Sequence, residues 1–430
     1  MPEPETDVII IGGGPAGSAT AAMLALSGAR VRLIERERFP RYSVGESLIP
    51  FCYYDLEKIG VLDAVRRAGF VRKVSVQFIR PDGSDTHPFY FDQHLTGEAA
   101  VTWQVDRGKF DAILLDHARS CGVEIIEDCE VRKIEQSDSG SVIGVTALDP
   151  AGVERFLPAR ITVDASGRRG LAMHQMGWFI PDPQLRKVAL WTYVRGAVRD
   201  PGRDEGATTV AYVGGKNWFW WIPLADDRVS VGIVGDADYL FANGKDLEAV
   251  FHRESRKSSW IRDHLAGATP AGPFRVTSDF SYRSRHIATD GLVLVGDAFA
   301  FLDPVFSSGL FLALKSGVMA AEAIAKGLEG GSVEAARFTE YAVKYCGALE
   351  AMRQLVHAFY DPEFSFGKVI RKYPEVRSDL TDCLIGNVDR DLSRLFRVLA
   401  EFASIPPALE FSHPLSLATV DPGASRGSTR

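Results

Sequence analysis

The glycines near the N-terminus are spaced in a way that suits a dinucleotide. Gly12, Gly14 and Gly17 form G-x-G-x-x-G directly after an apolar run, and Glu35 ends a second apolar run. The first glycine permits a tight turn, the second lets the backbone approach a pyrophosphate, and the third lets helix and strand pack closely. The phosphates would meet the positive end of a helix, and the acid would bind ribose hydroxyls. The alternative is a glycine-rich turn in an ordinary βαβ unit.

Two strands and a helix are expected to hold this turn. Residues 8–11 and 31–34 are apolar runs, typical of parallel strands that are covered on both faces. Small residues with helical spacing at 18–26 predict the helix between them. Later runs in the same style predict that parallel strands resume, at 123–126, 131–134, 161–167 and 291–297.

The middle of the chain has a different pattern. Strand-like segments with polar turns predict an antiparallel sheet, at 188–194, 208–213, 218–222 and 228–234. Residues 71–79 alternate between polar and apolar and predict one more strand, with Lys73 near its beginning. Helical patterns dominate from residue 333.

The predicted fold class is α/β, with three parts and a tail. A Rossmann-like domain is assembled from segments 1–70, 105–170 and 286–332, and an antiparallel β-sheet domain is inserted as 71–104 and 171–285. A helical region follows at 333–418. The last residues, 419–430, lack apolar periodicity and predict a disordered tail.

The composition narrows the class of protein. The 430 residues carry a net charge of −7, which argues against a nucleic-acid partner. Five cysteines without a C-x-x-C pair favour reduced thiols and a cytoplasmic location, and the scattered histidines predict no metal site. Residues 8–29 carry no charge and mimic a membrane span, but their acidic flank and glycines favour a buried βαβ unit, so we expect no span.

Four motifs in chain order resemble those of the aromatic-hydroxylase-like FAD monooxygenases. They are the glycine turn with its acid, Arg107 before an apolar helix, the segment 164–167, and Gly296-Asp297-Ala298. Alone, the arginine could make a surface ion pair and Asp297 could cap a helix. In that family they contact FAD and its ribityl chain. The resemblance implies FAD bound by Gly12, Gly14, Pro15, Ala16, Gly17, Glu35, Ser47, Arg107, Val131, Asp297 and Gly309.

Three further stretches resemble the flavin-dependent halogenases. Residues 218–223 contain W-x-W-x-I-P, and GESLIP followed by the strand with Lys73 resembles the segment that carries the family's essential lysine. In the turn at 301–309, the family holds a halide on backbone N–H groups at the positions of Ser308 and Gly309. An aromatic core strand and a solvated edge lysine are the ordinary alternatives. A passage for the oxidised halogen would be lined by Trp218, Trp220, Ile222, Pro223, Pro304 and Ser307.

One departure indicates a subgroup. Tryptophan halogenases carry a glutamate in this turn where the present chain has Phe306, and they are longer. The resemblance is better to halogenases of phenols or pyrroles, which are either free or tethered to an acyl carrier protein. Phe89 and Phe359 belong to aromatic groups that could line a ring pocket, but such spacing is more often core.

The resemblance implies a reaction. Reduced FAD from a separate flavin reductase would react with dioxygen and with chloride or bromide to give hypohalous acid, which is relayed to Lys73. The amine would form an N-haloamine or donate a hydrogen bond to the acid; the first role calls for a pKa lowered by burial. The competing predictions are an aromatic hydroxylase or prenyl-type reductase on the same scaffold, and an inactive flavin-loaded binding protein. The general base, the substrate and the halide preference stay open.

Overall fold

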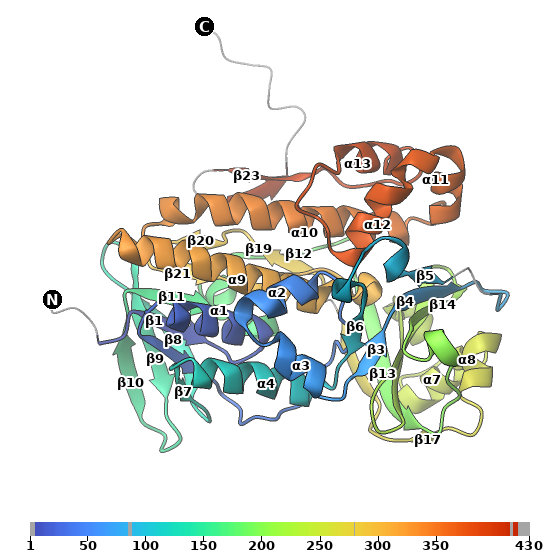
Figure 1. The fold of residues 1–430 in the computed structure, drawn as a ribbon, viewed down its shortest axis with the longest axis horizontal. Coiled ribbons are helices and arrows are strands. Elements are labelled where there is room, and N and C mark those ends of the chain that lie inside the picture. The colour runs from blue at the N-terminus through green and yellow to red at the C-terminus, as the bar shows by residue number, and fades with distance from the viewer. Residues whose placement is uncertain (1–4, 85–87, 279, 413–415, 420–430) are drawn as a thin grey trace, which may run out of the picture.

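A six-stranded sheet forms the centre of the nucleotide-binding half (Figure 1). The computed structural model describes residues 5–84, 88–278, 280–412 and 416–419. The strand order is β20-β21-β11-β1-β2-β7; neighbours from β21 to β7 run parallel, and β20 pairs antiparallel with β21. The strands lie within the three segments expected to form this half: β1 (Val8–Ile11), β2 (Val31–Ile34), β7 (Glu124–Ile126), β11 (Ile161–Asp164), β20 (Ala288–Thr289) and β21 (Leu292–Leu294).

Helices of small residues pack closely on this sheet. α1 (Pro15–Leu26) follows the glycine turn and α9 (Ser308–Glu329) lies against it. A Cβ on Gly317 of α9 would stand 2.6 Å from the carbonyl oxygen of Ala16, so only glycine permits this approach. α9 is long and apolar enough to cross a membrane, but 72% of its most apolar window is buried inside the fold, as in the core helix of a soluble protein. The other helices here are α2 (Cys52–Ile59), α3 (Leu62–Arg67), α4 (Arg107–Ser120) and α5 (Leu171–Gln175).

The second half contains a larger sheet, of order β17-β13-β16-β15-β14-β4-β5, with β18 paired to β13. We expected it to be antiparallel throughout, but β4 runs parallel to β14. A long stretch of chain separates these two strands, so no hairpin forces them to be antiparallel. The strands are β4 (Ser75–Ile79), β5 (Phe89–Tyr90), β13 (Lys187–Arg195), β14 (Thr208–Gly214), β15 (Asn217–Pro223), β16 (Arg228–Asp236), β17 (Thr269–Pro270) and β18 (Arg275–Ser278).

One face of this sheet carries a second hydrophobic core. Phe219, Trp221 and Ile233 pack there against Phe251 of α7 (Leu247–Ser255) and Ile261 of α8 (Ser259–His264). The short helix α6 (Ala237–Leu240) follows β16. The opposite face of the sheet, with Trp218 and Trp220, packs toward the nucleotide-binding half.

The expected parallel strand at 131–134 is wrong. β8 (Glu130–Gln136), β9 (Val142–Leu148) and β10 (Glu154–Pro158) form a separate antiparallel meander, because short turns join them in sequence. A further small sheet, β12-β19-β22, joins segments of both halves through β12 (Phe179–Pro181), β19 (Tyr282–Ser284) and β22 (Ala300–Phe301).

The expected single strand at 71–79 breaks at Val74. Its first part, β3 (Val71–Lys73), pairs with β6 (Thr102–Gln104), whereas β4 joins the large sheet. Lys73 is therefore the last residue of a short strand at the joint between the two halves.

Four helices cover the upper edge in Figure 1: α10 (Thr339–Tyr360), α11 (Phe366–Lys372), α12 (Arg377–Ile385) and α13 (Ser393–Leu399). α10 lies along α9. The helical region does not extend to residue 418, because β23 (Leu409–Ser412) and β24 (Ser416–Thr419) pair antiparallel. Beyond Thr419, which ends β24, the predicted disordered tail lies outside the described residues.

Candidate active site

The turn after β1 leaves no room for side chains. Gly12 has a φ of +102°, and a Cβ there would stand 2.5 Å from the carbonyl oxygen of Ala165. A Cβ on Gly17 would stand 2.0 Å from the carbonyl oxygen of Gly12. Both positions need glycine, and the turn thereby exposes backbone to the cavity beside it.

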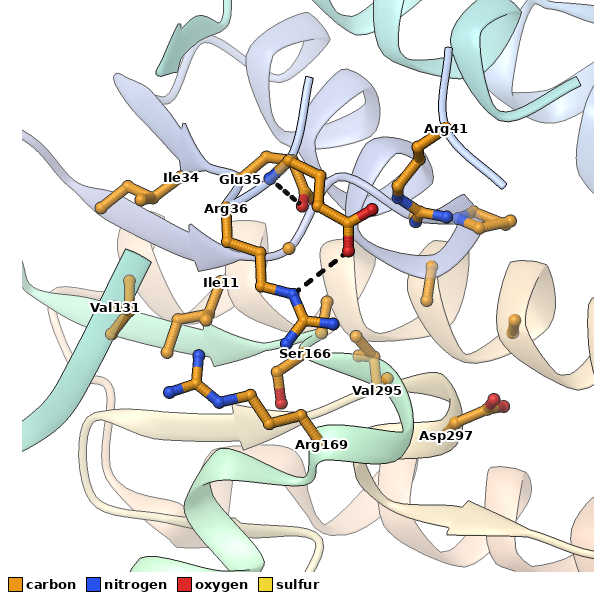
Figure 2. A pocket seen from close by; sticks show the side chains of 18 of the residues that line it. Ile11, Ile34, Glu35, Arg36, Arg41, Val131, Ser166, Arg169, Val295 and Asp297 are labelled. Carbon is orange, nitrogen blue, oxygen red and sulfur yellow. Dashed lines mark hydrogen bonds and ion pairs between the residues drawn. The ribbon is translucent and has the colours of Figure 1, made fainter. Parts of the chain in front are cut away.

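That cavity, here called the nucleotide cavity, encloses about 760 Å³ (Figure 2). Glu35 lies at its rim, where its carboxylate accepts hydrogen bonds from the N–H of Gly13 (2.7 Å) and of Glu37 (2.9 Å). Figure 2 shows Val131 toward one end and Asp297 toward the other. Gly17 supports the turn from behind rather than lining the cavity. The other lining residues include Gly12, Gly14, Pro15, Ala16, Arg36, Arg41, Arg107, Ser166 and Arg169.

A second cavity of about 1140 Å³, partly open to solvent, continues from the first; it is called the flavin cavity here after the cofactor expected from the sequence. The two share four lining residues: Pro15, Arg107, Asp297 and Ala313. Its remaining walls are mainly apolar and come from both halves of the molecule. They include Ser47, Thr208, Trp218, Trp220, Ile222, Phe280, Phe301, Asp303, Pro304, Ser307 and Gly309.

The junction of the cavities carries charge in a buried setting. Arg107 holds Asp111 through two hydrogen bonds (2.8 and 3.0 Å) and donates to the carbonyl oxygen of Val44 (2.6 Å). The carboxylate of Asp297 accepts no hydrogen bond from any residue that the structure describes, and burial raises its pKa to about 6, against the opposing effects of Arg107 and Arg168. Asp297 is half-buried where the two cavities meet, and its carboxylate has no hydrogen-bond donor among the described residues. An acceptor in this place suits the hydroxylated linker of a flavin dinucleotide, so the residues present fit FAD.

Strand β15 presents one of its faces to the flavin cavity. Side chains alternate along a strand, so Trp218, Trp220 and Ile222 line the cavity while Phe219 points into the second core. Pro223, which we expected in the passage, does not line this cavity, because the same alternation turns it away.

The turn before α9 is held by a buried carboxylate. Asp303 accepts a hydrogen bond from the N–H of Val305 (2.9 Å), which caps the single 3₁₀ turn Pro304–Phe306. Ser307 then adopts a left-handed conformation with φ +54°, and Ser308 begins α9. The N–H groups of Ser308 and Gly309 donate to no acceptor among the described residues. The Ser308 side chain is buried, and Gly309 lines the flavin cavity.

Lys73 is fully buried just outside the flavin cavity. Its Nζ donates hydrogen bonds to Ser47 Oγ (2.8 Å) and to the carbonyl oxygen of Leu48 (2.9 Å), and lies 5.7 Å from the centre of the Phe91 ring. Burial lowers its pKa from 10.5 to about 7. The lowered pKa agrees with the expectation for an amine that must be partly neutral.

Hydroxyl groups connect this amine to the flavin cavity. Ser47 Oγ lies 2.8 Å from Thr208 Oγ1, and Gln104 Nε2 donates to Thr208 Oγ1 at 2.8 Å. Ser47 and Thr208 both line the flavin cavity. Beside them, the buried Thr102 Oγ1 and Gln104 Oε1 have no hydrogen-bond partner within the described part of the chain. The Lys73 amine is thus linked to the flavin cavity by a row of hydroxyl groups, although the residues around them are mainly apolar.

A third and narrow cavity, here called the ring cavity, lies on the far side of Thr208 and Ser307 from the flavin cavity. Its space of about 20 Å³ holds little more than one water molecule. It shares Thr208, Val305 and Ser307 with the flavin cavity. No ionisable side chain lines it. The other lining residues are Ile49, Val76, Phe78, Phe89, Phe91, Phe306 and Leu384.

The profile of the tryptophan halogenase family matches residues 7–97 and 90–365 of this chain. A Pseudomonas fluorescens chlorinase, named for 1H-pyrrole-2-carbonyl on a peptidyl-carrier protein, is 30% identical over 409 residues, which cover 90% of each chain. The chain belongs to the flavin-dependent halogenases. The tryptophan 2-halogenase of Chondromyces crocatus is 33% identical over 365 residues, covering 83% of this chain and 68% of that protein.

Solved halogenase structures have the same fold. The myxobacterial chondrochloren halogenase CndH superimposes with a TM-score of 0.79 at 32% identity, over 93% of this chain and 96% of its own. The flavin-dependent brominase Bmp2 gives a TM-score of 0.81 at 29% identity, over 92% and 98%. The protein is therefore an FAD-dependent halogenase, with FAD as cofactor and halide as co-substrate.

Some residues of this halogenase site had no usable sequence signal. Thr208 lies on an ordinary strand, and its role is visible only from its hydrogen bonds with Ser47 and Gln104 in the folded chain. Asp303 lies in the turn 301–309, but its hydrogen-bond partner Tyr360 is distant in sequence, so no local pattern indicates the pair. Phe89 lines the ring cavity, whereas Phe359 packs in the core. Within the described ranges, no cluster of His, Cys, Asp or Glu could hold a metal ion.

Proposed function

We propose that this halogenase uses reduced FAD, dioxygen and chloride or bromide to halogenate an electron-rich aromatic ring, through hypohalous acid relayed to Lys73. The observation that carries the proposal is the placement of the Lys73 amine. It is buried, bonded to Ser47 of the flavin cavity, and close to Phe91 of the ring cavity. FAD, when bound, supplies the reduction of dioxygen and the oxidation of halide.

Different residues of the chain would bind the parts of FAD and the halide. The glycine turn and Glu35 bind the adenosine end of FAD, and Arg107 and Asp297 bind the middle. The N–H groups of Ser308 and Gly309 would hold the halide, since free amides at the start of a helix attract anions. A separate flavin reductase would supply the reduced cofactor.

Lys73 could act in either of two forms. A neutral amine forms an N-haloamine, whereas an ammonium group donates a hydrogen bond that makes the halogen more electrophilic. A pKa of about 7 means that both forms are present near neutral pH. The hydroxyls of Ser47 and Thr208 would guide hypohalous acid from one cavity to the next.

The ring cavity favours an uncharged substrate, which would enter as the side chains of its wall move apart, since its space in this structure is about 20 Å³. Burying a carboxylate without a partner is costly, and none of the lining residues is ionisable. Phe306 is one of its walls, where the tryptophan halogenases carry a glutamate. A pyrrole or phenol whose carboxyl group is masked as a carrier-protein thioester meets these conditions, and the names of two relatives include a pyrrole-2-carbonyl carrier-protein substrate.

The separation of the two cavities favours halogenation over hydroxylation. A hydroxylase or a prenyl-type reductase needs its substrate against the flavin, whereas here the ring cavity lies beyond Thr208 and Ser307. A small diffusible oxidant can cross that wall.

The test replaces Lys73 by Met and compares the variant with Lys58→Met, an exposed lysine on α2. With photoreduced FAD, dioxygen and bromide, the K73M variant should lose halogenated pyrrole thioester by about 10²–10⁴-fold. Hypohalous acid trapped by monochlorodimedone and the flavin content should stay as in K58M. Halogenated product at the K58M level would exclude the lysine relay, and failure of the wild type to form hypohalous acid would favour the hydroxylase or an inactive binding protein.

A further inference from the structure

A single buried carboxylate ties together three elements around the flavin cavity. Asp303, which is 2% exposed, accepts hydrogen bonds from the N–H of Val305 (2.9 Å) and from the hydroxyl of Tyr360 (3.0 Å). That hydroxyl in turn accepts a hydrogen bond from Trp218 Nε1 (3.0 Å). Asp303 therefore connects the turn before α9 to the tryptophan strand β15 and to the end of α10.

Few charges face this carboxylate. Tyr360 approaches from α10, and Lys187 on β13 lies with its Nζ 4.7 Å from the Tyr360 ring centre. Lys187 also forms an ion pair with Asp236 of β16. Burial raises the pKa of Asp303 to about 7, while the bonds from Val305 and Tyr360 and the charge of Lys187 lower it. The acid is thus balanced between its neutral and ionised forms near neutral pH.

Asp303 and Gly309 line the same cavity; Asp303 caps the 3₁₀ turn Pro304–Phe306, and Gly309 is the second residue of α9, which follows that turn. A negative charge on Asp303 would repel an anion held at the amides of Ser308 and Gly309, and water-poor surroundings strengthen that repulsion. A neutral Asp303 would not. Because Asp303 accepts a hydrogen bond from Val305 N–H, its charge lies within the same turn that leads to Ser308 and Gly309.

We propose that Asp303 is a positioning residue that couples halide binding to proton uptake, so that the turn accepts a halide when Asp303 is neutral and releases it when Asp303 is ionised. This inference rests on the proposed halide site at Ser308 and Gly309. It assigns to the halogenase a pH-dependent affinity for its inorganic co-substrate.

Bromide titration of the holoenzyme with oxidised FAD, followed by calorimetry between pH 6.5 and 8.5, tests the coupling. In the wild type the Kd for bromide should be constant below the pKa of Asp303 and rise about tenfold per pH unit above it. In Asp303→Asn the Kd should stay at the low-pH value throughout. Because Tyr360 and Lys187 lower the pKa of Asp303, Tyr360→Phe and Lys187→Met should each move the break to higher pH. Lys133→Met, an exposed lysine on β8, is the matched control and should leave the break in place.

Other ionisable groups near the flavin cavity also titrate, and their effects on the Kd for bromide must be distinguished from that of Asp303. Loss of the charge on Lys73 as pH rises would weaken halide binding with the same sign, so Lys73→Met is measured in parallel and should keep the wild-type slope. Asp297, whose raised pKa is about 6, titrates near the low end of this range, where the Kd is expected to be constant. Glu46, whose pKa burial also raises, accepts a hydrogen bond from Tyr193. The proposed role of Asp303 is overturned, while the halide site stands, if the pH dependence of the Kd for bromide persists in D303N or disappears in K73M. Absence of bromide binding by the wild type at every pH overturns the halide site itself, and with it the proposed function of the turn.

Discussion

The Nζ of Lys73 donates a hydrogen bond to Ser47 Oγ over 2.8 Å, which fastens a buried amine to a residue of the flavin cavity. Ser47→Ala should therefore lower the rate of halogenation about tenfold, equivalent to ~1.4 kcal/mol of lost transition-state stabilisation. The amount of trapped hypohalous acid per bound FAD should not change. Ser43→Ala, in the same loop but without a bond to Lys73, is the control. Equal product formation by the two variants would contradict the role of Ser47.

The wall between the cavities can be tested at Thr208. Thr208→Val keeps the shape of the side chain and removes the hydroxyl that contacts Ser47 and Gln104. We expect hypohalous acid to escape, so that the ratio of trapped acid to halogenated product, both measured by chromatography, rises about tenfold. Thr209→Val changes the neighbouring residue, which bonds Gln77 instead, and should keep the wild-type ratio. An equal ratio of trapped acid to halogenated product in the two variants would contradict a role for the Thr208 hydroxyl.

Burial of Lys73 should cost stability in a pH-dependent way. Its pKa is about 7 in the folded chain and close to 10.5 when exposed, so between these values the unfolded chain binds the additional proton. The stability of the wild type relative to Lys73→Met should then rise with pH, by up to ~1.4 kcal/mol per unit, and fall as pH drops toward 7. Calorimetric Tm values at pH 7.5, 8.5 and 9.5 would measure this difference. A difference that is constant over this range would show that Lys73 has an ordinary pKa.

The glycine turn makes a prediction about cofactor content. A Cβ at position 17 would overlap the carbonyl oxygen of Gly12, so Gly17→Ala should distort the turn and reduce bound FAD at least tenfold. Gly347→Ala in α10 meets no atom within 4 Å and should leave the flavin absorbance of the purified protein unchanged. Full flavin occupancy in G17A would rule out close packing at this position as a requirement for binding.

Local patterns were enough to predict the first two strands of the central parallel sheet, although not the antiparallel pairing of β8. The strands β1 and β2 have the predicted bounds, because an apolar run between turn residues defines a buried parallel strand by itself. The family motifs added FAD and the halogenase assignment, which the comparisons confirm.

Features that depend on distant partners were not predictable. The break at Val74 exists because β3 bonds to β6 while β4 bonds to β14, and neither partner is near in sequence. The tryptophan motif by itself predicts that Pro223 lines the passage together with Trp218, but the alternation of side chains along β15 turns Pro223 to the opposite face. The bond from Tyr360 to Asp303 joins the C-terminal helices to the turn before α9, and no local pattern indicates it.

The ring cavity shares only Thr208, Val305 and Ser307 with the flavin cavity. Most of its wall, including Phe78, Phe89 and Leu384, therefore lies outside the flavin cavity. If the ring cavity receives the substrate, as proposed, mutations there would change which ring is accepted while the generation of oxidant continues. Such a division makes the scaffold evolvable, because new substrate preferences can be explored one side chain at a time without loss of the underlying halogen chemistry.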